Sequence, residues 1–240
     1  VEGLSAISSG LVLLWLAGGA FLASAVGGAL NGKLAPNNAV RIGVFLELIA
    51  VAGIAFVASN EGGWAGIAPF LFVYGIGIGL ATAQLTGVIM VDVPMDKAGQ
   101  ASGSQSTVRQ IGSALGIAVL GTVLFSFTQS SIESRIQALP SLSVIEESAR
   151  ADLAVAVAKP VSDSAGAAIA AIPAILAPQN LSAEAVADIT LATKEGFTDG
   201  MKATGWAAAL FLVLGLASTF NLGSAKTAPA ATTRQKKAKK

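Results

Sequence analysis

The sequence predicts an all-α integral membrane protein with about five transmembrane helices and a helical insertion outside the bilayer. Of its 240 residues, 53% are hydrophobic and only 12% are charged, and the mean hydropathy is +0.70. This composition is too apolar for an ordinary soluble domain. A bilayer core of about 30 Å requires roughly 20 apolar residues in helical form, and we predict five such segments.

Composition also excludes several function classes. The formal net charge is +1 and aromatic residues make up 6% of the chain, so nucleic-acid binding is not expected. The chain has no cysteine and no histidine, which removes disulfides, thiol nucleophiles and Cys/His metal sites. Any proton chemistry must then use carboxylates. No nucleophile, base and orienting group converge at a recognisable spacing, so we predict neither an enzyme nor a cofactor.

The first predicted transmembrane helix covers residues 10–30, within a charge-free stretch. Small residues recur there every four positions, at Gly19, Ala23 and Gly27, which favours close approach of a second helix. The chain begins at Val1 and lacks the basic start of a signal peptide. We therefore expect it to be a fragment or a processed piece of a longer protein.

The second predicted helix covers residues 40–58 and contains Glu47. A carboxylate at this depth costs about 2.5 to 3.5 kcal/mol on insertion scales, so it must face protein or water. Two interpretations stay open, because no cationic partner lies nearby in the sequence. Glu47 is either a proton-coupling carboxylate or a structural glutamate that is protonated or hydrogen-bonded at a helix contact.

The third predicted helix, residues 64–91, is free of charge. Its few polar side chains offer hydrogen bonds in an otherwise apolar span, which makes them candidates for the wall of a substrate pathway. These residues are Thr82, Gln84 and Thr86.

The fourth predicted helix, residues 102–127, opens on a polar stripe and contains the costly Arg109. This arginine can extend to the interface, pair with a loop carboxylate such as Asp92 or Asp96, or contact a ligand together with Gln110. The stripe follows from spacings of three and four, which place its members on one helix face: Ser102, Ser106, Arg109, Gln110 and Ser113.

Glycines four residues apart occur in both central helices, at Gly75 and Gly79 and at Gly112 and Gly116. We predict that both pairs pack against neighbouring helices. The run 75–79 is not a nucleotide-binding loop, because it lacks the G-x-G-x-x-G spacing and a preceding strand.

After the fourth helix the composition changes. Charges and prolines return in 128–200, which predicts an insertion of short amphipathic helices, one of them over 182–192 with Ser182 as its N-cap. Residues 164–177 are apolar but too short to span, so a re-entrant or interfacial helix is an alternative there. The last predicted transmembrane helix is 201–223, and the chain ends in a basic tail, 224–240.

Positive charges predict the orientation. Lys33 and Arg41 flank the first loop, Lys97 lies in the third, and the tail is basic, whereas the turn at 59–63 has no cation. Five spans place all three basic segments on one face. We therefore expect a plasma-membrane protein with a cytoplasmic C-terminus and an extracytoplasmic insertion.

Four strings in the central region carry a resemblance to a known family: 83–86, 92–94, 99–103 and 107–116. In order and spacing they resemble the late C-terminal spans of the 14-span drug:proton antiporters of the major facilitator superfamily, the EmrB/QacA type. The resemblance implies that this chain is the C-terminal portion of such a transporter. It also implies a missing N-terminal half and a small hydrophobic or cationic substrate exported against proton entry.

The first loop resembles the signature cytoplasmic loop of this family at Gly28 and Lys33. Gly32 and Ala35 stand where the family has an acidic residue and a glycine. The candidate gating residues of the two cytoplasmic loops are then Gly28, Lys33, Asp92 and Asp96.

Our leading hypothesis from the sequence is part of a proton-coupled multidrug exporter that works by alternating access. It uses the proton gradient as its energy source, and its partners are the substrate, the bilayer and the other half of the same transporter. The alternative is a non-transporting membrane scaffold or receptor-like protein, in which the polar stripe serves only helix contacts.

Overall fold

The computed structural model describes residues 6–29, 34–59, 63–90, 92–164 and 166–220. Five helices are long and apolar enough to cross a membrane, which confirms the predicted all-α class with five spans. They are α1 (Ala6–Ala29), α2 (Pro36–Val57), α3 (Gly63–Met90), α4 (Ala98–Gln137) and α7 (Ala183–Thr219).

Shorter helices lie between the long ones. A single turn, η1 (Met95–Lys97), connects α3 to α4. Five short elements connect α4 to α7: η2 (Pro140–Leu142), α5 (Glu147–Asp163), η3 (Ala167–Ala171), α6 (Ile172–Leu176) and η4 (Ala177–Gln179).

Helices α4 and α7 are longer than the sequence analysis predicted. They contain 40 and 37 residues and, at 1.5 Å per residue, reach about 60 Å and 55 Å, nearly twice the thickness of a bilayer core. The predicted insertion helix at 182–192 and the last span are therefore one continuous helix. Ser182 caps its start by accepting a hydrogen bond from the Ala185 N–H at 3.1 Å.

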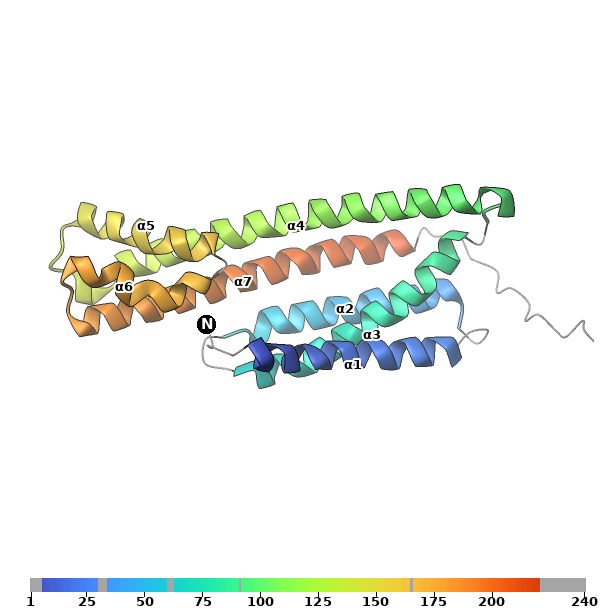
Figure 1. Cartoon of the computed structure of the whole chain (residues 1–240), viewed down its shortest axis with the longest axis horizontal. Helices are drawn as coiled ribbons and strands as arrows, with labels where there is room; N and C mark the ends of the chain where they lie inside the picture. Colours follow the sequence, from blue (N-terminus) through green and yellow to red (C-terminus); the bar gives the residue numbers. More distant parts are fainter. Residues whose placement is uncertain (1–5, 30–33, 60–62, 91, 165, 221–240) are drawn as a thin grey trace, which may run out of the picture.

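Helix α7 stays unbroken at Gly196 and Gly200 because α4 lies directly against both. A Cβ atom at Gly196 would lie 2.8 Å from the backbone nitrogen of Ile132, and one at Gly200 would lie 3.0 Å from the Cα of Thr128. This contact keeps α4 and α7 side by side where they extend beyond α1, α2 and α3 (Figure 1). We call these three helices and the portions of α4 and α7 outside residues 128–200 the membrane part.

In the membrane part, α3 packs against both α1 and α2. A Cβ atom at Gly75 would lie 2.1 Å from the carbonyl oxygen of Leu16, and one at Gly79 would lie 2.8 Å from the Cβ of Ala23. The contact with α2 is similarly close, since a Cβ atom at Gly77 would lie 2.7 Å from the carbonyl oxygen of Gly43. These three helices form one group.

Helix α7 joins α4 to this group by packing against α2. Near its middle, a Cβ atom at Gly205 would lie 2.7 Å from the Cβ of Ala55. At its end, Arg41 of α2 donates a hydrogen bond to the Thr219 carbonyl at 3.1 Å, with its guanidinium 4.8 Å from the centre of the Phe220 ring. Helix α4 packs along α7 but makes little contact with α3, so α4 lies at the edge of the bundle.

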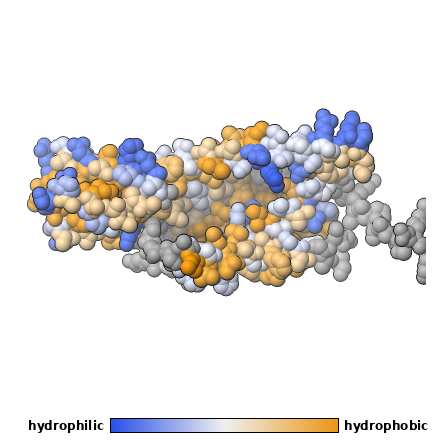
Figure 2. Space-filling view, in the orientation of Figure 1, coloured by the Kyte–Doolittle hydropathy of each residue, from blue (hydrophilic) through white to orange (hydrophobic). Residues whose placement is uncertain are grey.

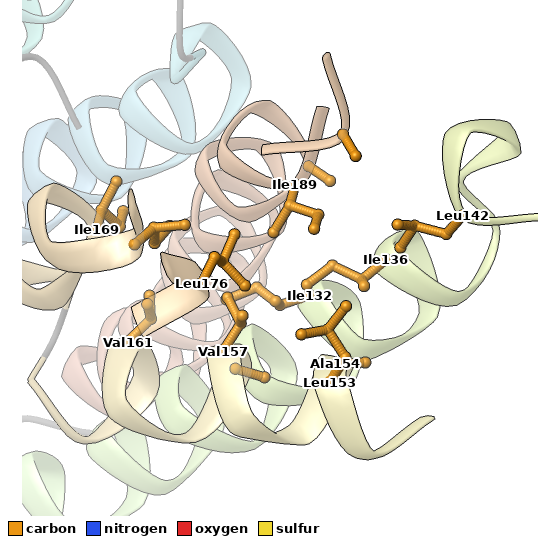
Figure 3. Packing of buried hydrophobic residues seen from close by; sticks show 14 of the residues in the cluster. Ile132, Ile136, Leu142, Leu153, Ala154, Val157, Val161, Ile169, Leu176 and Ile189 are labelled. Atoms are coloured by element: carbon orange, nitrogen blue, oxygen red, sulfur yellow. The ribbon is translucent and has the colours of Figure 1, made fainter. Parts of the chain in front are cut away.

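Residues 128–200 form a compact unit, which we call the head. Its core is made of aliphatic side chains from α4, α7 and the short helices (Figure 3). Residues 164–177 belong to it, because Ile169, Ile172 and Leu176 are buried in this core. The packing therefore favours a place in the head for this segment over the re-entrant alternative. The fully buried large side chains of the core are Ile132, Ile136, Leu142, Val157, Val161, Ile172, Leu176 and Ile189.

Candidate functional site

The candidate site begins with a cavity of about 410 Å³ between α2, α3, α4 and α7. Tyr74 has the only polar side chain among the residues that line it, so the cavity is almost entirely apolar. Figure 2 shows the surface hollowed between α4 and the group below it, with hydrophobic residues around the hollow. We call it the apolar cavity, and it is lined by Val51, Tyr74, Gly112, Leu115, Gly116, Val119, Leu120, Ala208, Phe211 and Leu212.

A polar contact joins α3 to α4 toward the start of α4. The Gln105 Nε2 donates a hydrogen bond to the Thr86 Oγ1 at 3.3 Å. Gln105 precedes Gly112 by seven residues, which places the two on the same face of α4. The contact therefore lies two turns from the apolar cavity along that face. The sequence analysis missed Gln105, although it lies three residues after Ser102 and four before Arg109, at the spacing that defines the polar stripe.

The structure brings only part of the predicted substrate pathway together. Thr82 and Thr86 are exposed and Gln84 is half-buried, and Thr86 accepts the hydrogen bond from Gln105 of α4. Arg109 and Gln110 are exposed on α4. In the part of the chain that the structure describes, no ion pair links Arg109 to either carboxylate of the α3–α4 connection.

Glu47 lies at the contact between α2 and α3, beside the apolar cavity. Its Cγ would lie 2.8 Å from a Cβ atom on Gly77, which follows Tyr74 by about one helical turn on α3. Val51, one turn after Glu47 on α2, lines the cavity together with Tyr74 of α3. Among the described residues, no cation pairs with Glu47.

The predicted gating residues do not form one cluster. Gly28 lies in the last turn of α1, whereas Lys33 falls outside the described residues. Asp92 and Asp96 are exposed in the connection between α3 and α4.

The two glycine pairs have different surroundings. Gly75 and Gly79 lie in the tight contact with α1, but a Cβ atom at Gly112 or Gly116 would have no neighbour within 4 Å among the described residues. No helix among the described residues therefore packs on Gly112 and Gly116, and their packing against a neighbouring helix stays a prediction. They line the apolar cavity instead, because the gap between α4 and α3 leaves this face uncovered.

A second, polar cavity of about 350 Å³ lies where the head meets the membrane part. Arg135 of α4 forms ion pairs with Glu195 and Asp199 of α7, the second at 2.9 Å. Ser131 also donates a hydrogen bond to Asp199, at 2.8 Å. Sequence reasoning missed this network, because its partners lie 60 or more residues apart and follow no motif. Ser59, Thr198 and Lys202 complete the wall of this cavity.

Comparison with known proteins relates part of this chain to a protein family. Residues 1–117 match the sequence profile of the Major Facilitator Superfamily. No solved structure matches the chain.

Several curated proteins are similar over about half of this chain. The tetracenomycin C resistance and export protein of Streptomyces glaucescens is 33% identical over 128 residues, which are 52% of this chain and 23% of that protein. The multidrug resistance protein Stp of Mycobacterium tuberculosis is 29% identical over 57% of this chain and 25% of its own length. The multidrug efflux pump LfrA of Mycolicibacterium smegmatis is 30% identical over 55% and 26%. The matched part therefore spans about a quarter of each relative.

Proposed function

Because this multi-pass membrane protein belongs to the Major Facilitator Superfamily, we propose that it is the C-terminal part of a secondary transporter that exports hydrophobic or cationic drugs. The observation that carries the proposal is the similarity of about half of this chain to proteins named for drug export and resistance. The chain covers about a quarter of their length, so the activity belongs to the complete transporter.

In this proposal, the start of α4 and the end of α3 form part of the substrate pathway. Thr82, Gln84 and Thr86 offer hydrogen bonds, and Arg109 with Gln110 lies nearer the cytoplasmic side. The hydrogen bond between Thr86 and Gln105 supports a common polar surface on the two helices. Both side chains keep access to solvent or substrate from this position.

Glu47 is the candidate for proton coupling. Its place in the middle of α2 supports this role, because a mid-membrane carboxylate is costly unless it is used or neutralised. Its close contact with α3 at Gly77 also lets a change of charge alter the packing of α2 on α3 near the apolar cavity. In alternating access, such a site near the midplane lies between parts that move relative to each other.

The orientation is also part of the proposal. With the C-terminus in the cytoplasm, the segments that contain Lys33, Arg41 and Lys97 share that face, and the head lies on the opposite, extracytoplasmic face. Labelling of cysteines introduced at positions 97 and 150 of this cysteine-free chain tests this in intact cells. Position 150 should react from outside, and position 97 should be protected. The reverse pattern contradicts the orientation.

The export activity is tested by dye efflux from cells that express the complete gene, with and without a proton uncoupler. We expect efflux that stops when the uncoupler is added. A Glu47→Gln variant should export more slowly under a pH gradient, while Gln84→Ala should change the dye preference without loss of coupling. Normal pH-driven export by Glu47→Gln assigns that residue a structural role, and absence of efflux from the wild type favours the scaffold.

A further inference from the structure

The polar cavity between the head and the membrane part lies where three helices change from apolar to polar. Residues 110–132 of α4 and 203–219 of α7 contain no charged residue. Arg135 lies just beyond the first stretch and Lys202 directly before the second, and both line the cavity. Helix α2 ends at Val57, and Ser59 beyond it lines the same cavity. Because charge-free apolar stretches of roughly 20 residues fill the bilayer core, the cavity lies at the membrane surface.

The cavity contains two positive and two negative side chains, but only one of the two cations is paired. Arg135 forms ion pairs with both Glu195 and Asp199. Lys202 follows Asp199 by three residues on α7, a spacing at which helical ion pairs form. It nevertheless pairs with no carboxylate among the described residues. The half-buried Lys202 side chain therefore brings to the cavity wall a positive charge that the described part of the chain does not neutralise.

Each of the two carboxylates has one oxygen available to a ligand. Arg135 and Ser131 both donate to the Oδ2 of Asp199, at 3.0 Å and 2.8 Å. Arg135 also donates to the Oε2 of Glu195. The second oxygen of each carboxylate accepts no hydrogen bond from a described residue. Because both side chains are about 40% exposed, these oxygens can accept from a donor that enters the cavity.

This arrangement of charges favours a zwitterionic ligand. The charges of Arg135 and Lys202 cancel those of Glu195 and Asp199, so only a ligand with one positive and one negative group leaves the cavity neutral. A phosphate suits Lys202, and a primary ammonium can donate to the two available carboxylate oxygens. The volume of about 350 Å³ is at the small end of the range for ligand pockets, ~300–1,000 Å³, and suits a head group.

An apolar track continues from the cavity along one face of α7. Trp206 and Leu210 follow Lys202 at intervals of four residues, so the three side chains lie on the same helix face. Trp206 is 51% exposed and Leu210 is 60% exposed. Tryptophan is typical of the level where a membrane meets water, one turn above the acyl chains. A ligand with its charged end in the cavity could therefore lay apolar chains along this face.

We propose that the polar cavity binds the head group of an aminophospholipid. The phosphate binds Lys202, the ammonium group donates to Glu195 and Asp199, and the acyl chains lie along Trp206 and Leu210. The lipid then connects the head to the membrane part and fixes the depth of their junction. This inference goes beyond the proposed export function and requires only that the head lies at the membrane surface, on either side.

The first test is lipid retention by the purified complete gene product. The protein is delipidated in detergent and titrated with lipids of identical acyl chains, and native mass spectrometry counts the lipids that stay bound. Phosphatidylethanolamine should be retained several-fold better than phosphatidylcholine, whose trimethylated amine has no N–H to donate. It should also exceed phosphatidylglycerol, which has the phosphate but no ammonium group. Retention that does not favour phosphatidylethanolamine over both overturns the proposal.

Substitutions separate the head-group contacts from the chain contact. Lys202→Gln should lower retention of phosphatidylethanolamine several-fold, whereas Lys202→Arg should preserve it. Glu195→Gln leaves the cavity with a positive charge, so the preference should move to phosphatidylglycerol. Trp206→Ala should weaken retention of all three lipids by the same factor. The matched control is Lys194→Gln, which removes a lysine from α7 outside the cavity wall and should behave as the wild type.

The remaining outcomes identify other ligands or other places. Glycerophosphoethanolamine is the same head group without acyl chains, and it should not compete with the lipid at equal concentration. If it does, the cavity binds a free zwitterion. If Lys202→Gln retains phosphatidylethanolamine normally, the lipid binds elsewhere on the protein. Either result overturns the proposal. Because lipid retention is measured without transport, a protein that selects this lipid but exports no dye refutes the proposed function alone.

Discussion

The head and the membrane part are built from the same chain but hold together in opposite ways. In the head, large aliphatic side chains such as Ile132, Ile136 and Ile189 are completely buried. In the membrane part, large side chains such as Phe21, Phe56 and Ile117 point outward and are 73% to 79% exposed, while glycine and alanine occupy the contacts. Large apolar side chains therefore fill the interior of the head but lie on the surface of the membrane part, where small residues form the helix contacts.

The difference shows which solvent each region is adapted to. Water drives apolar side chains into the core of the head, because burial removes their surface from water. Lipid offers no such driving force, so the membrane helices depend on close van der Waals contact, which only small residues permit. Large-to-small substitutions should therefore damage the head, and small-to-large substitutions should damage the membrane part.

The largest expected effect is functional and separates the two regions most strongly. Arg109→Ala should abolish drug export by the complete transporter while the protein still reaches the membrane, because a charged side chain within a membrane span is costly to insert and this one lies on the polar stripe of α4. Export from membrane vesicles measures it. Lys159→Ala, in an exposed ion pair of the head, should export normally. Unchanged export by Arg109→Ala removes this residue from the pathway.

The next effect tests the core of the head. Ile136→Ala should lower the free energy of unfolding by about 2 to 5 kcal/mol, because it empties a completely buried site. Ile117→Ala, an identical substitution in the same helix, should have almost no effect, since Ile117 is 73% exposed. Thermal unfolding in detergent compares the two variants. Equal losses of stability would mean that Ile117 is as well packed in the membrane span of α4 as Ile136 is in the core of the head.

A smaller effect is expected from the opposite kind of substitution, small to large, in the membrane part. Gly19→Ala adds a methyl group 2.2 Å from the Phe72 carbonyl oxygen and should destabilise the α1–α3 contact by about 1 to 3 kcal/mol. The adjacent Gly18→Ala has no neighbour within 4 Å and serves as its control. The difference between their melting temperatures is the measurement. If Gly18→Ala is the more damaging variant, α1 does not contact α3 through Gly19.

The smallest effect concerns the boundary between the two regions. Arg135→Gln removes the ion pairs with Glu195 and Asp199, whose side chains are about 40% exposed, so solvent screening limits the loss to about 1 kcal/mol. The loss should shrink further at high salt. Melting of wild type and variant at low and high ionic strength measures it. A loss that salt leaves unchanged would point to packing of the arginine stem instead.

Much of the fold could be predicted from hydropathy alone. Lipid offers no hydrogen-bond partner to the backbone, so a long apolar segment with few charges is expected to form a transmembrane helix, in which its peptide groups hydrogen-bond to one another. The cap at Ser182 was also predictable, because a cap depends on residues within one turn. The continuity of α4 and α7 was not predictable, since it depends on the contact of each helix with the other.

The sequence by itself determined the class, the five spans and the faces on which small and polar residues lie, because these follow from local periodicity. Only the tertiary structure decided what lies opposite those faces. Gly75 and Gly79 repeat at the same spacing as Gly112 and Gly116, yet one pair is pressed against a helix and the other lines a cavity. Spacing specifies the direction in which a residue points, whereas its energy depends on the atoms that other parts of the chain bring to meet it.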